Sequence, residues 1–248
     1  MGFYRGPHIV TDGLIMYLDA GNTKSYGGTG TAWYDRAANL NAGVVHDATL
    51  VNGPSFDSSN KGSIAFNGTN NYASLGQNSL ASPNISMIFW VKGDYSNYYL
   101  GVLDRIPGTS AGLNVPIPYN GWIQVGYISG GSINYFVING LRYISNAFGR
   151  YSYDFATDRP LYSAADTLFG GPSSPNFAFS LQAGIGSSYT TPYVWSDRNN
   201  RLIGRGQSGS GSSRYFNGNI SNVAIYNRTL SESEVKQNYD ALKSRYEL

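Results

Sequence analysis

Residues 214–239 read RYFNGNISNVAIYNRTLSESEVKQNY, a stretch that passes from a strand pattern to a helix start within a few residues. Ser231 and Glu234 form the pattern of a capping box, in which each side chain bonds a backbone N–H group at the start of a helix. Leu230 stands directly before this cap and can pack on Val235 as a hydrophobic staple. We therefore expect a strand that is followed at once by a helix beginning at Ser231.

The residues after the cap continue the helix pattern. Apolar side chains recur at spacings of four, three and four, which places one stripe along the helix: Val235, Tyr239, Leu242 and Tyr246. A single amphipathic helix of this length is marginal on its own. We expect it to dock on the rest of the chain.

The chain before this helix is rich in strand and turn patterns. Residues 85–92 (ISMIFWVK) alternate, and their odd-numbered side chains are apolar and share one face, as a half-buried strand requires. Trp90 lies on the opposite face, which we expect another element to cover. Residues 133–144 form the clearest hairpin pattern, around the turn pair Asn139–Gly140. Short strands joined by such turns indicate an all-β sandwich or barrel rather than a βαβ fold.

Composition excludes several classes of partner and site. The 248 residues have a net charge of +2 and only 13% charged residues, so neither a nucleic acid nor an acidic membrane is expected as a partner held by charge. The chain has no cysteine, which excludes disulfides and thiolate metal sites. No apolar run approaches the ~20 residues of a membrane span. The N-terminus lacks the pattern of a secretory signal, so we expect a soluble chain made without an export signal.

Two stretches carry a family resemblance. FNGNISNVAIYNRTLSESEVKQNY at 216–239 and GSIAFNGTNNYASLG at 62–76 resemble motifs of the laminin-G-like branch of the concanavalin A-like lectin/glucanase superfamily. The resemblance implies a two-sheet antiparallel jelly-roll sandwich with a short C-terminal α-helix. On this basis we divide the chain into an N-terminal arm (1–11), a sandwich (12–230) and a helix packed on it (231–248). Residues 145–200 match the family poorly, and we expect this aromatic-rich insertion to contain further strands or to become ordered against a neighbour.

The opening of the chain carries a second resemblance. GPHIVTDGL at 6–14 is similar to the start of such domains in virion proteins of tailed bacteriophages. This implies a structural protein of the virion, a capsid decoration or fibre component, with other capsid or tail proteins as partners. It also implies a homo-oligomer or many copies in each particle. The arm residues Phe3, Tyr4 and Arg5 are then candidates for anchoring the chain to the particle.

The alternative function is a glycan-binding module that recognises host surface polysaccharide. The family fold is a frequent sugar binder, and aromatic side chains stack on sugar rings. The candidates for stacking or for an interface are Tyr95, Tyr98, Tyr99, Trp122 and Trp195. The competing interpretation of these residues is packing in the core or at an interface. The two functions are compatible, because a particle decoration can also bind sugars.

The superfamily also contains glucanases, and an enzyme of this kind would need catalytic carboxylates. Retaining glycosidases need two carboxylates about 5–5.5 Å apart. The glutamates of this chain are Glu232, Glu234 and Glu247, all of which fall in or after the expected helix. Asp154 and Asp158 lie in the poorly matching region, where solvation of a loop explains them better. We therefore predict that the chain is not an enzyme and has no catalytic residues.

A calcium site is the remaining cofactor question. The resemblance implies aspartates where this chain has Asn67, Asn71, Ser221 and Asn222. Because carboxylates supply most of the affinity for calcium, these neutral residues argue against a site, although Asp19 and backbone carbonyls remain as ligands. Asparagine is also a good turn former, and that role is the better account of Asn67 and Asn71. We expect no cofactor.

Overall fold

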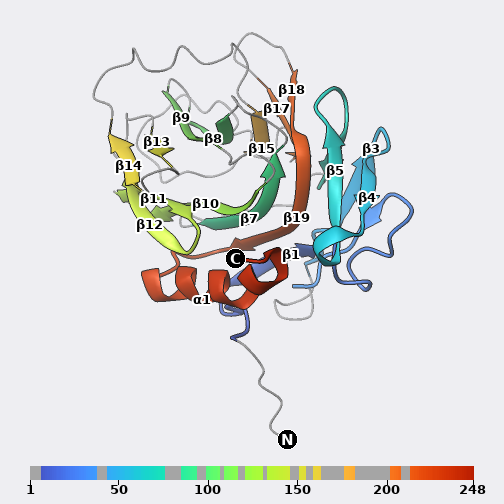
Figure 1. Ribbon diagram of the computed structural model, residues 1–248, viewed down its shortest axis with the longest axis horizontal. Coiled ribbons are helices and arrows are strands. Elements are labelled where there is room, and N and C mark those ends of the chain that lie inside the picture. Colours follow the sequence, from blue (N-terminus) through green and yellow to red (C-terminus); the bar gives the residue numbers. More distant parts are fainter. Residues whose placement is uncertain are drawn as a thin grey trace, which may run out of the picture.

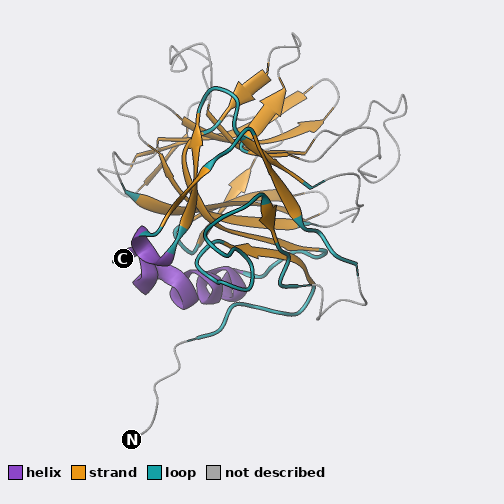
Figure 2. Cartoon of the chain, turned by 90° about the vertical axis from the view of Figure 1, so that its right-hand side faces the viewer, coloured by secondary structure: helices purple, strands orange, loops and turns teal. Residues whose placement is uncertain are grey.

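The computed structural model describes residues 7–37, 44–75, 85–93, 99–106, 109–116, 121–130, 133–145, 151–154, 159–162, 176–181, 202–207 and 213–248. Two large β-sheets face each other, and a helix near the C-terminus lies against the outside of one of them (Figure 1; Figure 2). The expected fold class, an all-β two-sheet sandwich with a short C-terminal helix, is confirmed. No helix among the described residues is long and apolar enough to cross a membrane.

The first sheet has eight strands, and every described pairing in it is antiparallel. Its path is β12 (Leu141–Ser145), β11 (Ile133–Ile138), β10 (Trp122–Gly130), β7 (Ser86–Gly93), β19 (Asn217–Tyr226), β5 (Ser63–Asn67) and β4 (Ser55–Asp57), with β1 (Leu14–Asp19) beside β19. Strand β19 is the hub of this sheet. It pairs with β7 along one side, and β5 and β1 share its other side.

The second sheet has nine strands. Its order is β14 (Arg159–Tyr162), β13 (Tyr151–Asp154), β9 (Thr109–Pro116), β8 (Tyr99–Ile106), β15 (Asn176–Leu181), β16 (Leu202–Ile203), β6 (Tyr72–Ser74), β3 (Ala48–Val51) and β2 (Ala32–Trp33). The poorly matching region 145–200 supplies β13, β14 and β15, so it contains strands of this sheet. Two pairings depart from the antiparallel expectation, because β13 pairs with β9 and β15 with β8 in parallel. A separate hairpin joins β17 (Arg205–Gln207) to β18 (Ser213–Tyr215).

Strand β7 shows how the sequence pattern sets the layers. Met87, Phe89 and Val91 are fully buried between the two sheets, as their alternation predicts. Ile88 and Trp90 point to the other face of the first sheet and are also buried. Both faces of this sheet are therefore apolar, and a third layer must cover the outer one.

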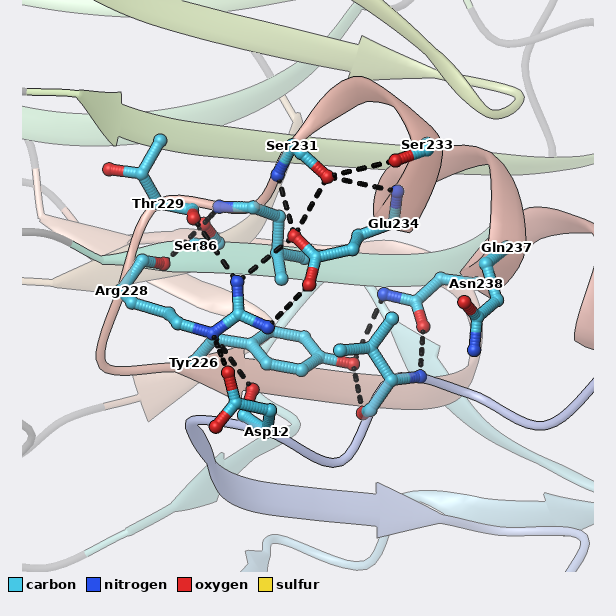
Figure 3. Close-up of polar contacts among 12 residues, drawn as sticks. Asp12, Ser86, Tyr226, Arg228, Thr229, Ser231, Ser233, Glu234, Gln237 and Asn238 are labelled. Carbon is cyan, nitrogen blue, oxygen red and sulfur yellow. Dashed lines mark hydrogen bonds and ion pairs between the residues drawn. The ribbon is translucent and has the colours of Figure 1, made fainter.

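Helix α1 (Glu232–Leu242) and the 3₁₀ turn η3 (Lys243–Tyr246) form that third layer, which we call the helix layer (Figure 1). The helix begins with the predicted capping box, since the Ser231 hydroxyl accepts the Glu234 N–H and the Glu234 carboxylate accepts the Ser231 N–H at 2.8 Å (Figure 3). Arg228 donates to the same carboxylate at 2.6 Å. The Arg228 guanidinium, followed by donors on Ser231, lowers the pKa of Glu234 to about 2 although burial opposes this.

The end of the N-terminal arm belongs to the same layer. Asn238 of α1 accepts the Val10 N–H at 2.8 Å, and the Tyr226 hydroxyl donates to the Val10 carbonyl at 3.1 Å. Asn238 also donates to the Tyr226 hydroxyl at 3.1 Å, which closes a buried ring of three hydrogen bonds (Figure 3). The helix therefore fixes the chain at Val10. The anchoring candidates Phe3, Tyr4 and Arg5 lie outside the described residues.

Aromatic rings fill the space between η3 and the sheet. Trp90 stacks on Tyr246 with ring centroids 4.2 Å apart and on Tyr239 at 5.6 Å. Trp122 lies against Tyr246 at 4.8 Å. Such pairs contribute about 0.5–1.5 kcal/mol each beyond the burial of their area. The apolar stripe that the sequence predicts on the helix thus has aromatic partners on the sheet.

Arg245 fastens the C-terminal turn to the sandwich. Its guanidinium pairs with Asp19 at 2.6 Å, and it donates to the Ser221 hydroxyl at 2.7 Å. It also donates to the carbonyls of Gly62 and Asn60, both at 2.8 Å. Asn60 and Gly62 have φ values of 49° and 122°, so the loop before β5 takes an unusual backbone path to present these carbonyls. One buried cation therefore joins three segments of the chain.

We predict that Arg245→Ala lowers the free energy of unfolding by about 3–5 kcal/mol, because it leaves the buried Asp19 carboxylate without its partner. Chemical denaturation followed by tryptophan fluorescence measures this loss. The control is Lys243→Ala, which removes a partly exposed ion pair to Asp240 near the same turn and should change stability little. Equal losses in the two variants would contradict the proposed importance of the buried pair.

Candidate functional site

Of the five aromatic residues that the sequence predicts as candidates, the structure describes the side chain of one, Trp122. Trp122 is only 7% exposed, donates from its indole nitrogen to Asn60 at 3.0 Å, and packs under η3. Its position corresponds to the packing interpretation, and its ring offers no free face to a sugar. The backbone of Tyr99 starts β8, but its side chain lies outside the described part, as do Tyr95, Tyr98 and Trp195 entirely. These four remain predictions.

The glutamates lie where the sequence predicts them, in and after the helix layer. Glu234 is committed to the helix cap and to Arg228, whereas Glu232 and Glu247 are exposed. Asp154 lies in β13 with its side chain outside the described part, and Asp158 is outside it altogether. Within the described residues, no group of three or more His, Cys, Asp or Glu side chains could hold a metal ion.

The turn after β5 tests the calcium question directly. The Asn67 side-chain oxygen accepts the backbone N–H groups of Thr69, Asn70 and Asn71, at 2.9, 3.1 and 3.2 Å. The Asn71 side-chain oxygen accepts the Asn67 N–H at 3.1 Å. Both oxygens therefore face N–H donors, which is the environment of a turn-forming asparagine and not of a cation ligand. The turn-forming interpretation of these two residues is confirmed.

The side-chain oxygens of Asp19 and Ser221 are also engaged by protein groups. Asp19 accepts from Arg245, and the Ser221 hydroxyl accepts from the same guanidinium while donating to the Gly62 carbonyl. The guanidinium thus supplies the positive charge that these oxygens need. This donor set does not fit a calcium ion in addition.

Polar side chains gather where two turns of the sandwich meet. One turn contains Asn52 and joins β3 to β4, and the other joins β5 to β6. Asn52 donates to the Asn70 carbonyl at 2.9 Å, and Asn71 donates to the Asn52 carbonyl. We call this surface the amide rim and define it by Asn52, Asn67, Thr69, Asn70 and Asn71. All of its members except Asn71 are exposed.

Two tyrosines lie beside the amide rim. Tyr72 of β6 and Tyr215 of β18 are half-buried, with ring centroids 6.5 Å apart and planes inclined by 41°. Gly68 holds the turn against the neighbouring strand, since it has a φ of 71° and an added Cβ would lie 2.6 Å from that of Asn217. Only glycine fits this approach. We call the two rings the tyrosine pair.

The amide rim and the tyrosine pair bring two chemistries to neighbouring positions, because Tyr72 directly follows Asn71 in the chain. Carboxamides both donate and accept hydrogen bonds, as sugar hydroxyls do. Tyrosine rings offer an apolar face with a polar edge. Strand β5 starts from the loop next to η3 and runs away from it, so this surface lies at the end of the sandwich far from the helix (Figure 1). The arrangement suits recognition of a carbohydrate without a metal ion.

The sequence did not single out this surface. The sequence pattern predicts a turn at FNGTNNY and points to no site at Asn52 or Tyr215. The one local signal is the density of asparagine in two turns, at 52 and at 67–71. Their proximity depends on the pairing of strands that lie far apart in the sequence.

Comparisons with known proteins agree with this architecture. Residues 181–236 match the family model of the concanavalin A-like lectin/glucanases superfamily. No curated protein matches the chain. Among solved structures, domain 4 of AbnA, a GH43 extracellular arabinanase from Geobacillus stearothermophilus, in complex with arabinotriose, is 12% identical with a TM-score of 0.51. The alignment covers 91% of this chain and 98% of that one.

Sialidases of Trypanosoma rangeli contain the same fold. A mutant that displays trans-sialidase activity is 14% identical with a TM-score of 0.50, over 96% of this chain and 34% of the sialidase. The complex with 2,3-difluorosialic acid, a covalent intermediate, is 14% identical with a TM-score of 0.51, over 94% and 33%. This chain therefore spans about a third of the sialidase length. Likenesses at these identities establish the fold and nothing further.

We predict that calcium does not stabilise the chain. A ligand that binds only the folded state at 100 times its dissociation constant adds about 2.7 kcal/mol of stability, so a real site would raise the melting temperature visibly. Differential scanning calorimetry in excess calcium and in EDTA should give the same transition. A melting temperature that rises with calcium in a saturable way would contradict the assignment of these oxygens to turns and to Arg245.

Proposed function

We propose that this chain is a non-enzymatic, lectin-like domain that binds glycans through the amide rim and the tyrosine pair. The observation that carries the proposal is that exposed carboxamides lie next to two half-buried aromatic rings, since Tyr72 directly follows Asn71 in the chain and its ring centroid lies 6.5 Å from that of Tyr215. Sugar-binding surfaces need both, because hydroxyl groups require donors and acceptors while the faces of the ring are apolar.

The rigidity of the amide rim supports this function. Asn67 is bonded to three backbone N–H groups, and Asn52 is bonded to Asn70 across the two turns. A surface that is already ordered loses less entropy when it binds a ligand. Weak polar contacts to a sugar can then give a measurable affinity.

The comparisons support the proposal at the level of the fold. The AbnA domain, which was solved with arabinotriose, aligns over nearly its whole length with this chain. The non-enzymatic part of the proposal depends on the carboxylates, since the glutamates of this chain lie in or after the helix layer and away from the amide rim. Most glycoside hydrolases use a pair of carboxylates at the reacting bond.

We predict binding on a glycan array, and a loss of about tenfold in affinity in each of Tyr72→Ala and Tyr215→Ala, equivalent to one aromatic contact of about 1.4 kcal/mol. Isothermal titration with the best array glycan measures the loss. Tyr34→Ala is the matched control, because Tyr34 is 51% exposed on a different loop and its removal should leave affinity unchanged. An array without any bound glycan, or equal losses in all three variants, would sink the proposal.

We also propose a place for this domain: a bacteriophage virion, as a capsid decoration or fibre component present in many copies. The support is the resemblance of GPHIVTDGL at 6–14 to virion proteins. In the fold, Asn238 and Tyr226 hold the arm at Val10 and so fix where the preceding residues leave the domain. That exit lies on the helix side, away from the amide rim (Figure 1).

Quantitative mass spectrometry of purified particles tests this location. We expect a copy number near that of the major capsid protein for a decoration, or a few copies per particle for a fibre. Deleting residues 2–6 should abolish incorporation while leaving the fold intact, because the hydrogen bonds at Val10 are retained. Absence of the chain from particles would overturn the location, and normal incorporation of the deletion would overturn the role of the arm.

A further inference from the structure

Four Asn–Gly pairs lie in the part of the chain that the structure describes: Asn52–Gly53, Asn67–Gly68, Asn139–Gly140 and Asn217–Gly218. Asparagine is among the thermolabile residues, and a following glycine leaves the backbone free to move and offers no side chain as an obstacle. The local sequence is therefore permissive at all four pairs. Their structural environments are different, and they predict very different reactivities.

The reaction at such a pair is an attack of the backbone on the side chain. The glycine nitrogen loses its proton to hydroxide and forms a bond to Cγ of the asparagine. The bond from Cγ to the amide nitrogen breaks, and this nitrogen takes a proton from water and leaves as ammonia, which regenerates the hydroxide. Water then opens the five-membered imide at either carbonyl, which gives aspartate or isoaspartate. The reaction needs only water and hydroxide, and it needs a glycine N–H that is not held by another bond.

Three of the four glycines are constrained by hydrogen bonds or by strand pairing. Gly68 donates its N–H to the Phe216 carbonyl at 2.9 Å. Gly140 donates to the Gln124 side chain at 3.0 Å in a buried position. Gly218 lies inside the hub strand β19, between β5 and β7. Attack at these positions first requires local opening of the fold, so the rate is reduced in proportion to the small fraction of molecules that are open.

The pair Asn52–Gly53 is different. Both residues are exposed at the tip of a turn, and a Cβ placed on Gly53 would meet no atom within 4 Å. Their φ values are 61° and 68°, which places both in the left-handed region. We propose that Asn52–Gly53 is a spontaneous modification site, at which the folded chain converts asparagine to aspartate or isoaspartate ahead of its other described Asn–Gly pairs.

This conversion changes the amide rim. It replaces the Asn52 side-chain NH₂ with a carboxylate oxygen, so the 2.9 Å hydrogen bond to the Asn70 carbonyl is lost and a negative charge faces that carbonyl. Isoaspartate also adds one carbon to the backbone of the turn. The proposal of a modification site at Asn52 does not depend on the proposed function. An effect of the modification on glycan binding does depend on the proposed function.

The test is peptide mapping by mass spectrometry after incubation of the folded chain at about pH 8.5. We expect the peptide that contains Asn52 to gain the mass of an amide-to-acid exchange first, with isoaspartate as one product. The same incubation in urea is the control, because unfolding removes the protection and should abolish the ranking of the four pairs. Conversion at Asn67, Asn139 or Asn217 as fast as at Asn52 in the folded chain would overturn the proposal.

Two variants separate the modification from its consequence. Gly53→Ala should slow the reaction at Asn52, because the new side chain obstructs the attacking nitrogen. The new Cβ meets no atom within 4 Å, but alanine is strained at a φ of 68°, so circular dichroism and the melting temperature must first show that the variant is folded under the conditions of the incubation. An unchanged rate in this variant would contradict the mechanism. Asn52→Asp mimics one product and should bind the array glycan more weakly than the unmodified chain. If Asn52 converts first but Asn52→Asp binds the glycan normally, the modification site stands and the role of Asn52 in binding fails.

Discussion

The structure depends on the need to cover both faces of one sheet. Strands β7, β10 and β19 carry apolar side chains on both sides, and the second sheet can cover only one of them. Without a third layer, Trp90 and Trp122 would lie in water, at a cost on the order of 1.5–3 kcal/mol or more for each large side chain. The C-terminal helix is marginal alone and the sheet face is unstable alone, so each supplies what the other lacks. This mutual requirement explains why the chain ends as a strand followed directly by a capped helix.

The same layer also determines where the two ends of the described chain are attached to the sandwich. Val10 is bonded to the helix and to the end of β19, and Arg245 is bonded to Asp19 and to the loop before β5. Both ends of the described chain are thus fastened on one side of the sandwich. The opposite end is formed by turns, and turns can vary in sequence without disturbing the core. An exposed carbohydrate-binding surface at that end is compatible with an attachment made through the helix side.

Local patterns predicted the features that local physics controls. The capping box at Ser231 and the alternation of β7 follow from neighbouring residues alone, and both are confirmed. The amide rim and the pairing of Arg245 with Asp19 could not be predicted in this way, because each depends on strands that are brought together only by the fold. Trp122 is a residue for which local sequence could not predict burial. Its position in a strand made it a candidate for stacking on a sugar ring. In the fold its ring is buried under η3 by Tyr246, a residue that lies far along the chain.

The replacement of carboxylates by amides links the stability of the amide rim to its proposed role. An aspartate at position 67 could accept the same three N–H groups, but it could not donate to Asn70 as the Asn67 side chain does at 2.9 Å. Several aspartates in this turn would also repel one another unless a cation lay between them. Asparagine satisfies both donors and acceptors within the turn, and Arg245 does the same for Asp19 with a guanidinium. Hydrogen bonds within the protein therefore order these turns, and among the described residues the amide rim and the tyrosine pair would offer a glycan hydrogen-bonding groups and aromatic rings.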